Sequence, residues 1–438
     1  MKEKFLKYVV PSVVAMWVYS LYTMADGIFV AQGVGEYALA AVNLSMPMIN
    51  ATFAISIMFA IGTSTIASIF IGEGKAEKAK ELFTRNGIIL FITWTLFVII
   101  CFFNFNGLVK LLGATEHTEG YVKDYLLIIL MFSIFPMASY YMEVMLKVDG
   151  KPKFATLGVC ISAVTNLTLD YVFVIVLKYG VKGAAIATVI SQCFSFTLFL
   201  IHFIRAGNRI EFVKFKFDLN ETIRTFKCGI PDFITEISSG ITVFTFNRII
   251  LSVIGEKGVV VYTVITYVNT LVTMTMIAVS QGMQPLVSYN YGKRDSKSIG
   301  EYFKLSIKTV VLLAILAFAI SQFFAVPINR VFISLKEAEL LKYSVSSFKL
   351  YSIVFLFLGF NIVLSGFYTA VEKPKIALII STARGIMVML LCLVAMSYMF
   401  KDTGIWLSAT VSEFVCLIAN VVVLLNTVRK IKTKEKVI

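Results

Sequence analysis

The chain has 438 residues, of which 58% are apolar and 15% are charged, and its mean hydropathy is +0.85. This composition excludes a soluble globular domain and indicates an integral membrane protein. The formal net charge of +14 does not indicate nucleic-acid binding, because the basic residues collect in loops between apolar spans, where the positive-inside rule accounts for them. The six cysteines are scattered and there are only two histidines, so we expect no disulfide framework, no structural metal site and no cofactor.

Twelve apolar stretches are long enough to cross a hydrocarbon core of about 30 Å as helices. In chain order they are 7–31, 38–70, 86–106, 122–146, 154–177, 181–204, 228–254, 258–291, 302–326, 343–370, 376–400 and 404–428. The sequence therefore predicts an all-α membrane protein with twelve transmembrane helices.

Lysine and arginine are unevenly divided between the two sets of alternate loops. The set that contains both termini and the basic stretch 205–227 holds 27 of these residues, and the opposite set holds 8. By the positive-inside rule, this excess predicts that both termini lie in the cytoplasm.

The two halves of the sequence repeat each other at a shift of about 220 residues, which places Gly62 on Gly282 and Gly72 on Gly292. We expect two homologous six-helix bundles joined by a linker: an N-terminal lobe at 1–210, a cytoplasmic linker at 211–223 and a C-terminal lobe at 224–438. Because six is even, both lobes start on the same side of the membrane, which suits alternating access around a central cavity.

Two aspartates lie inside apolar spans, where a charged side chain costs several kcal/mol unless it is paired, hydrated or protonated. Asp26 and Asp170 lie roughly 8 and 11 Å short of the outer ends of the first and fifth helices. Tyr22 and Asn166 lie one turn deeper on the same faces, and Thr188 in the sixth helix lies at a similar level. These side chains could exchange a proton or hold a sodium ion, with Asn166 and Thr188 as neutral ligands. The alternative is that the two acids are unrelated polar anchors near the interface.

The acidic residues have no equivalent in the second half of the chain. The repeat places Asp26 on Phe246 and Asp170 on Cys392. A symmetric structural role would place acids in both halves, so this difference favours a functional role for the acids of the first half.

At these residues the chain resembles the multidrug and toxic compound extrusion (MATE) family, in particular its DinF-like and MepA-like branches. The resemblance covers the whole length, and it is carried by Tyr22-x-x-x-Asp26, Asn166-x-x-x-Asp170, GVKGAAIATVISQ at 180–192 and QGMQPLVSYNYGKRD at 281–295. It implies that Asp26, Asn166, Asp170 and Thr188 form a cation or proton site in the N-terminal lobe. Relatives of the NorM type instead use acids in the seventh and tenth helices, where this chain has Glu236 and the neutral Asn361.

A second set of residues is expected to contact a cationic substrate, because aromatic and acidic side chains inside a membrane bind hydrophobic cations. This set is Glu236, Tyr125, Tyr140, Gln284 and Asn361. Glu236 has an alternative interpretation as the partner of a basic residue such as Arg384 or Arg248.

We therefore expect a monomeric, multi-pass protein of the bacterial plasma membrane that exports small cationic or amphipathic compounds in exchange for H⁺ or Na⁺. One alternative is a lipid-linked oligosaccharide flippase of the same superfamily. A membrane-embedded enzyme would need a nucleophile–base or metal motif, and the sequence contains no HExxH or GxSxG. A passive channel suits the two-half organisation less well.

Overall fold

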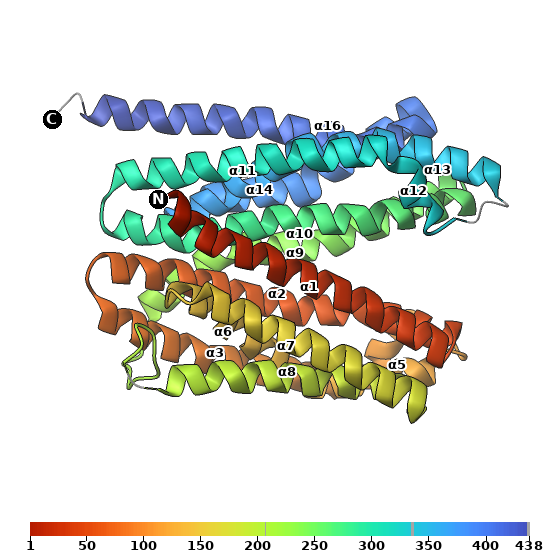
Figure 1. Cartoon of the computed structure of the whole chain (residues 1–438), viewed down its shortest axis with the longest axis horizontal. Coiled ribbons are helices and arrows are strands. Elements are labelled where there is room, and N and C mark those ends of the chain that lie inside the picture. Colours follow the sequence, from red (N-terminus) through yellow and green to blue (C-terminus); the bar gives the residue numbers. More distant parts are fainter. Residues whose placement is uncertain (206, 334–336, 436–438) are drawn as a thin grey trace. The chain divides into compact units, whose positions relative to one another are not determined.

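The computed structural model describes residues 1–205, 207–333 and 337–435, and within them every regular element is a helix (Figure 1). The elements are α1 (Lys2–Gly33), α2 (Glu36–Gly72), α3 (Ala76–Phe103), α4 (Phe105–Leu111), α5 (Glu119–Met131), α6 (Ile134–Val148), α7 (Pro152–Asp170), the π-helix η1 (Tyr171–Val176), α8 (Gly180–Ile204), α9 (Leu219–Val253), α10 (Glu256–Gly292), α11 (Ser296–Phe323), α12 (Ala325–Arg330), α13 (Ala338–Tyr351), the 3₁₀-helix η2 (Ser352–Val354), α14 (Phe355–Ala370), α15 (Pro374–Thr382), the π-helix η3 (Ala383–Met387) and α16 (Val388–Glu435).

The described helices account for all twelve expected spans, although not as twelve straight helices. Nine helical stretches are long and apolar enough to cross a membrane, and α5 and α6 form a further span that is bent by 47°. The stretch Pro374–Leu424 contains two of the expected spans, because the helix is broken at Lys401, where φ is 50° and ψ is −126°. The remaining span is α9, whose mean hydropathy is lowered by polar residues that include Asp232 and Glu236.

The internal repeat is visible in the helix boundaries. At a shift of 220 residues, α2 coincides with α10 and α3 coincides with α11 at both ends. The break between α5 and α6 recurs between α13 and α14. The two halves of the chain therefore share the same order of elements.

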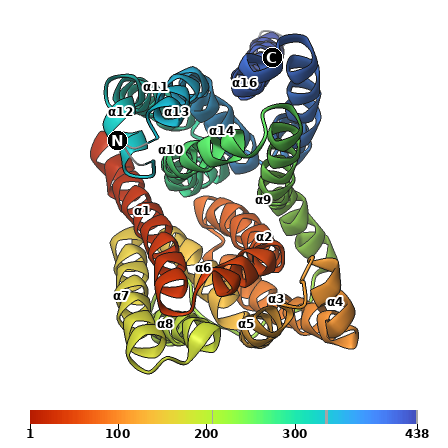
Figure 2. The same ribbon diagram turned by 90° about the vertical axis from the view of Figure 1, so that its right-hand side faces the viewer.

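The contacts divide the chain into two compact units. The first contains residues 1–237, 281–302 and 369–374, and the second contains the other described residues. In the first unit α1, α7 and α8 lie side by side, and α2 packs on α3, α5 and α6 (Figure 2). Its core mixes aliphatic and aromatic side chains, and the ring of Phe83 contacts the rings of Tyr141 and Phe203. The expected lobe boundaries at 210 and 224 stay a prediction from the repeat.

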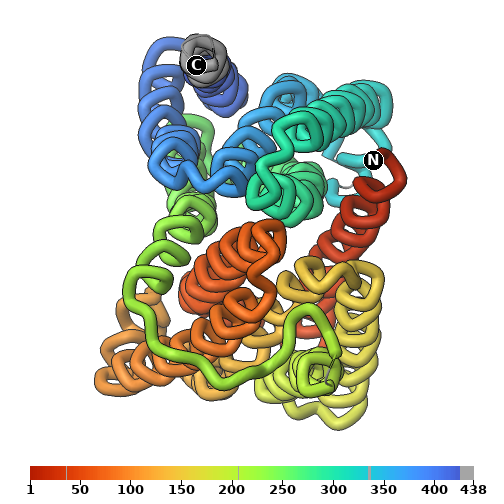
Figure 3. The backbone as a smooth tube through the Cα atoms, turned by 90° about the vertical axis from the view of Figure 1, so that its left-hand side faces the viewer, coloured from red at the N-terminus to blue at the C-terminus, as the bar shows by residue number. Residues whose placement is uncertain are grey.

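The segment between α8 and α9 crosses one end of the first unit (Figure 3). Asp149 accepts hydrogen bonds from the backbone amides of Arg209 (2.9 Å) and Ile210 (3.1 Å). Further along the segment, the Lys80 ammonium lies 2.8 Å from the Glu211 carboxylate. The hydrogen bonds of Asp149 and the ion pair of Lys80 therefore hold the linker against the helix bundle.

At the same end of the first unit, α2 and α10 cross at two glycines. A Cβ at Gly72 would lie 2.1 Å from the carbonyl oxygen of Tyr289, and a Cβ at Gly292 would lie 2.2 Å from that of Ile69. The repeat relates Gly72 to Gly292 and Ile69 to Tyr289, so the two contacts are equivalent. Only glycine allows the two backbones to approach this closely.

Candidate functional site

The three helices that carry the predicted ion site are neighbours in the first unit. Asp26 belongs to α1, Asn166 and Asp170 to the last turns of α7, and Thr188 to α8. Regular α-helix ends at Asp170, and the chain continues as the π-helix η1. Such π-helical turns occur frequently at functional sites, because the widened turn changes the direction of nearby side chains.

Asp26 and Asp170 come together as a buried pair. Asp170 is completely buried, Asp26 is 9% exposed, and their carboxyl groups lie close enough to interact electrostatically. Two buried carboxylates that lie this close repel each other, which favours a state in which they share a proton or bind a cation. The structure thus brings the two acids together, and their role as a coupling site stays a prediction.

Several buried oxygen atoms at this pair lack a donor. They are Oδ1 of Asp26, both carboxylate oxygens of Asp170 and Oδ1 of Asn166. No lysine, arginine or histidine in the described part of the chain forms an ion pair with either aspartate. Burying a hydrogen-bond acceptor without a donor costs free energy. This group of oxygen atoms is therefore suited to bind a proton or a cation.

The residues around the pair complete a shell of hydroxyl and amide groups. The Asn166 amide donates a long hydrogen bond of 3.4 Å to the Thr188 hydroxyl, and the Gln192 amide donates one of 3.4 Å to the Tyr22 hydroxyl. Tyr125, which we expected among the substrate contacts, is buried within electrostatic range of both aspartates. It therefore adjoins the ion site.

Three other predicted substrate residues, Tyr140, Glu236 and Gln284, lie in the first unit. The Tyr140 hydroxyl accepts a hydrogen bond of 2.9 Å from the Gln281 amide, and it lies within electrostatic range of Glu236. Gln284, one turn after Gln281, is 4% exposed. Tyr140 and Glu236 thus lie within electrostatic range of each other.

Asn361 belongs to a buried network of the second unit. Its amide donates to the Glu413 carboxylate (2.7 Å), and its carbonyl oxygen accepts from Asn420 (2.8 Å). The other carboxylate oxygen of Glu413 lies 2.6 Å from the Arg384 guanidinium. Arg384 thus has an acidic partner in Glu413, and its pairing with Glu236 stays a prediction from the sequence.

Sequence reasoning missed Glu413, and it also missed a buried ion pair between Glu143 and Lys147 on α6. The side chains of Glu143 and Lys147 are 9% and 2% exposed, and their charged groups lie 3.0 Å apart. An acid and a base four residues apart in an apolar helix are a recognisable signal for such a pair. No comparable signal links Glu413 to Arg384, which are 29 residues apart.

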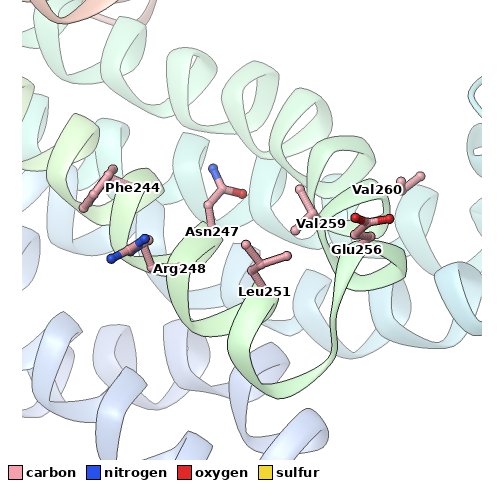
Figure 4. A pocket seen from close by; sticks show the side chains of 7 residues that line it. All are labelled: Phe244, Asn247, Arg248, Leu251, Glu256, Val259 and Val260. Atoms are coloured by element: carbon pink, nitrogen blue, oxygen red, sulfur yellow. The ribbon is translucent and has the colours of Figure 1, made fainter. Parts of the chain in front are cut away.

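The second unit also has an open cavity of about 400 Å³ between α9 and α10, lined by exposed and mostly apolar side chains (Figure 4). Arg248 and Glu256 are its charged residues.

Two repeated halves of apolar helices, the first of which contains a buried carboxyl pair, are the organisation of a multi-pass membrane transporter built from homologous bundles. The model of the MatE family matches the chain twice, at residues 11–172 and 233–394, so each half contains one copy. This chain belongs to the MatE family. It is a transporter and not an enzyme.

Similar proteins cover nearly the full length. The chain is 24% identical over 420 residues to the multidrug export protein MepA of Staphylococcus saprophyticus, covering 93% of this chain and 90% of that protein. It is also 24% identical to MepA of Staphylococcus haemolyticus, covering 92% of this chain and 89% of that protein.

Among solved structures, the outward-facing conformation of a multidrug resistance MATE family transporter superimposes with a TM-score of 0.92 at 20% identity, covering 99% of this chain and 97% of that one. A MOP superfamily transporter from Pyrococcus furiosus superimposes with a TM-score of 0.90 at 21% identity, covering 96% and 94%. These similarities establish the fold.

Proposed function

We propose that this transporter exports cationic or amphipathic compounds across a bacterial plasma membrane in exchange for H⁺ or Na⁺. The similarity to proteins named multidrug export proteins supports the direction and the substrate class. The single observation that carries the ion coupling is the buried contact between Asp26 and Asp170, which has no basic partner among the described residues.

Asp26 and Asp170 are the coupling residues in this proposal. With a proton, one carboxyl group donates to the other. With Na⁺, the two carboxylates and the neutral oxygens of Asn166 and Thr188 form the kind of all-oxygen donor set that hard cations prefer. Tyr22 and Tyr125 exclude water from the pair and supply hydroxyl groups at its edge.

Ion binding removes the charge of the pair, and release restores it. Since an uncompensated buried charge is costly, the two states favour different packing of α1 against α7 and α8. The excess of basic residues in alternate loops supports a cytoplasmic location for both termini. The protein acts as a monomer with the bilayer and its small-molecule substrate as partners.

The substrate is expected to contact Glu236, Tyr140 and Gln284. Tyr125 lies closer to the coupling site, and Asn361 contacts a substrate only where its network with Glu413 and Asn420 opens.

The test is efflux of ethidium from proteoliposomes in which the pH and Na⁺ gradients are imposed separately. We expect efflux that responds to one of the gradients, and its loss in Asp170→Asn, which retains the shape but not the charge of the side chain. Asp124→Asn is the matched control, because Asp124 is half-exposed and pairs with Lys182 at 3.2 Å. Unchanged coupled efflux in Asp170→Asn would remove the aspartate pair from the mechanism.

A further inference from the structure

The linker between α8 and α9 has an exposed face of mixed character (Figure 3). Residues 211–217 contain no helix, and from 211 to 216 the exposure of the side chains alternates from one residue to the next, as in an extended chain. The half-buried side chains are Glu211, Val213 and Phe215. The exposed side chains between them are Phe212, Lys214 and Lys216. The exposed face of the linker therefore presents an aromatic ring and two ammonium groups.

The linker backbone is attached to α3. The Val213 amide donates a hydrogen bond of 3.1 Å to the Thr84 hydroxyl, and the carbonyl oxygen of Lys216 accepts one of 3.4 Å from the Arg85 guanidinium. An open groove of about 590 Å³ lies between the linker and α3. The groove is lined by Thr84, Ile88, Phe212, Val213, Lys214 and Phe215.

The acids of the linker already have other partners. Glu211 pairs with Lys80 at 2.8 Å, and Asp218 accepts a hydrogen bond of 3.1 Å from a backbone amide at the start of α9. No acid in the described part of the chain forms an ion pair with Lys214 or Lys216. The two lysines therefore leave the exposed face of the linker positively charged.

The groove lies where α3 changes from a charged helix to an apolar one. Five charged residues precede Ile88 in α3, the last of them Arg85, and none follows it. From Ile88 onward, apolar side chains on one face of the helix are exposed, at spacings of four, four and three residues. These side chains are Ile88, Ile92, Leu96 and Ile99. The charged linker and the groove therefore lie at the boundary between the hydrocarbon core and the headgroups.

We propose that this groove binds one anionic phospholipid. The phosphate of its headgroup contacts the ammonium groups of Lys214 and Lys216, and an acyl chain lies along the exposed stripe of α3. A free phosphate would leave the apolar stripe without a partner, and a zwitterionic lipid would bring its own positive charge to the two lysines. By the positive-inside rule we expect the linker on the cytoplasmic side, where anionic lipids attract lysines.

The bound lipid connects α3 to the linker that joins the two halves of the repeat. This inference requires only that α3 crosses the bilayer, and α3 is long and apolar enough to do so. It is independent of the coupling ion and of the transported compound.

The test is native mass spectrometry of the purified full-length protein in detergent, titrated with phosphatidylglycerol or phosphatidylcholine of identical acyl chains. We expect tighter binding of phosphatidylglycerol to the native protein. In Lys214→Gln/Lys216→Gln this affinity should fall about tenfold, which corresponds to about 1.4 kcal/mol, and binding of phosphatidylcholine should not change. Equal phosphatidylglycerol affinity in the variant and the native protein would overturn the proposal.

Lys304→Gln/Lys308→Gln is the matched control. It removes two exposed lysines from α11, which the repeat relates to α3, and neither lysine forms an ion pair in the described structure. We expect phosphatidylglycerol affinity to remain at the native value in this variant. An equal loss in both double variants would assign the preference to overall charge and overturn the specific site.

Two further measurements identify the ligand and its position. Millimolar inorganic phosphate should not displace the lipid, because phosphate has no acyl chain, and displacement by phosphate alone would contradict lipid binding. In nanodiscs, amide hydrogen exchange of residues 212–217 should be slower with phosphatidylglycerol than with phosphatidylcholine. Equal exchange of this segment in the two lipids would place the bound lipid elsewhere and overturn the proposal.

Discussion

At the scale of single residues, this protein stabilises its buried acids in different ways. Glu143 and Glu413 each have a basic partner, Lys147 and Arg384, within 3.0 Å and 2.6 Å. Asp170 has no basic partner in the described structure and instead contacts a second carboxyl group. A fixed ion pair has no need of an exchangeable ion, whereas two adjacent carboxyl groups need one to remain buried.

The pair should therefore titrate as a unit. In the native protein we expect the protons of Asp26 and Asp170 to be released in two coupled steps. In Asp26→Asn only one carboxyl group remains, so a single step is expected. Infrared difference spectroscopy of carboxyl protonation measures both. A titration of Asp170 that is identical in the two proteins would show that the acids do not interact.

At the scale of elements, the linker between α8 and α9 depends on a titrating contact. The hydrogen bond from the Lys80 ammonium holds the pKa of the Glu211 carboxyl below its usual range. The Glu211 carboxylate also accepts a hydrogen bond of 2.9 Å from the Gly207 amide. Because folding depresses this pKa, the contact stabilises the linker above the unfolded-state pKa of about 4.3 and is lost as the pH falls through the folded-state value.

We expect the Gly207 amide to lose protection from hydrogen exchange, after correction for intrinsic rates, as the pH is lowered through that range. In Glu211→Gln the protection should be weaker at neutral pH and nearly independent of pH. Exchange measured by mass spectrometry tests this. Protection in the variant that still falls at the same pH would assign the effect to another group.

The crossing of α2 and α10 also belongs to this scale. Alanine at Gly72 would bring its Cβ to 2.1 Å from a backbone oxygen that cannot rotate away. We expect Gly72→Ala and Gly292→Ala to lower the free energy of unfolding by about 1–3 kcal/mol each, as overpacking does.

Gly300→Ala in α11 is the control, because no heavy atom lies within 4 Å of its Cβ position. That change should be neutral or stabilising by about 0.5–1 kcal/mol, since alanine favours helix more than glycine does. Thermal unfolding in detergent measures all three variants. Equal midpoints for Gly72→Ala and Gly300→Ala would contradict the close approach.

At the scale of the whole molecule, the two halves share their helices but not their polar groups. At a shift of 222 residues, Ser162 and Ser191 of the first half correspond to Arg384 and Glu413 of the second. The serines are joined by a neutral hydrogen bond of 3.0 Å, whereas the later residues form an ion pair. We infer that the exchangeable ion binds in the first half, whereas the second half has a fixed ion pair at the position of these serines.

Glu413→Gln should therefore affect stability more than coupling. Removal of one partner from a buried pair costs about 3–5 kcal/mol, because the other charge is left uncompensated. The double variant Arg384→Gln/Glu413→Gln should recover part of this loss. Unfolding midpoints and the response of ethidium efflux to each gradient measure the two effects. Loss of coupling in a well-folded double variant would place an ion site in the second half.

Much of this architecture was predictable from the sequence by itself. Hydropathy identifies twelve spans because a helix must present about 20 apolar residues to lipid, whatever its neighbours are. The grouping of Asp26, Asn166, Asp170 and Thr188 was predictable because helical periodicity defines a face and distance from the helix end defines a depth.

Only the tertiary structure decided which helices are neighbours and where they bend. Arg384 could have met any acid at its depth, and the packing of η3 against α16 selected Glu413. The 47° bend between α5 and α6 is invisible to hydropathy, which does not depend on backbone direction. Depth in the membrane is a property of one helix, whereas a binding site is a property of several.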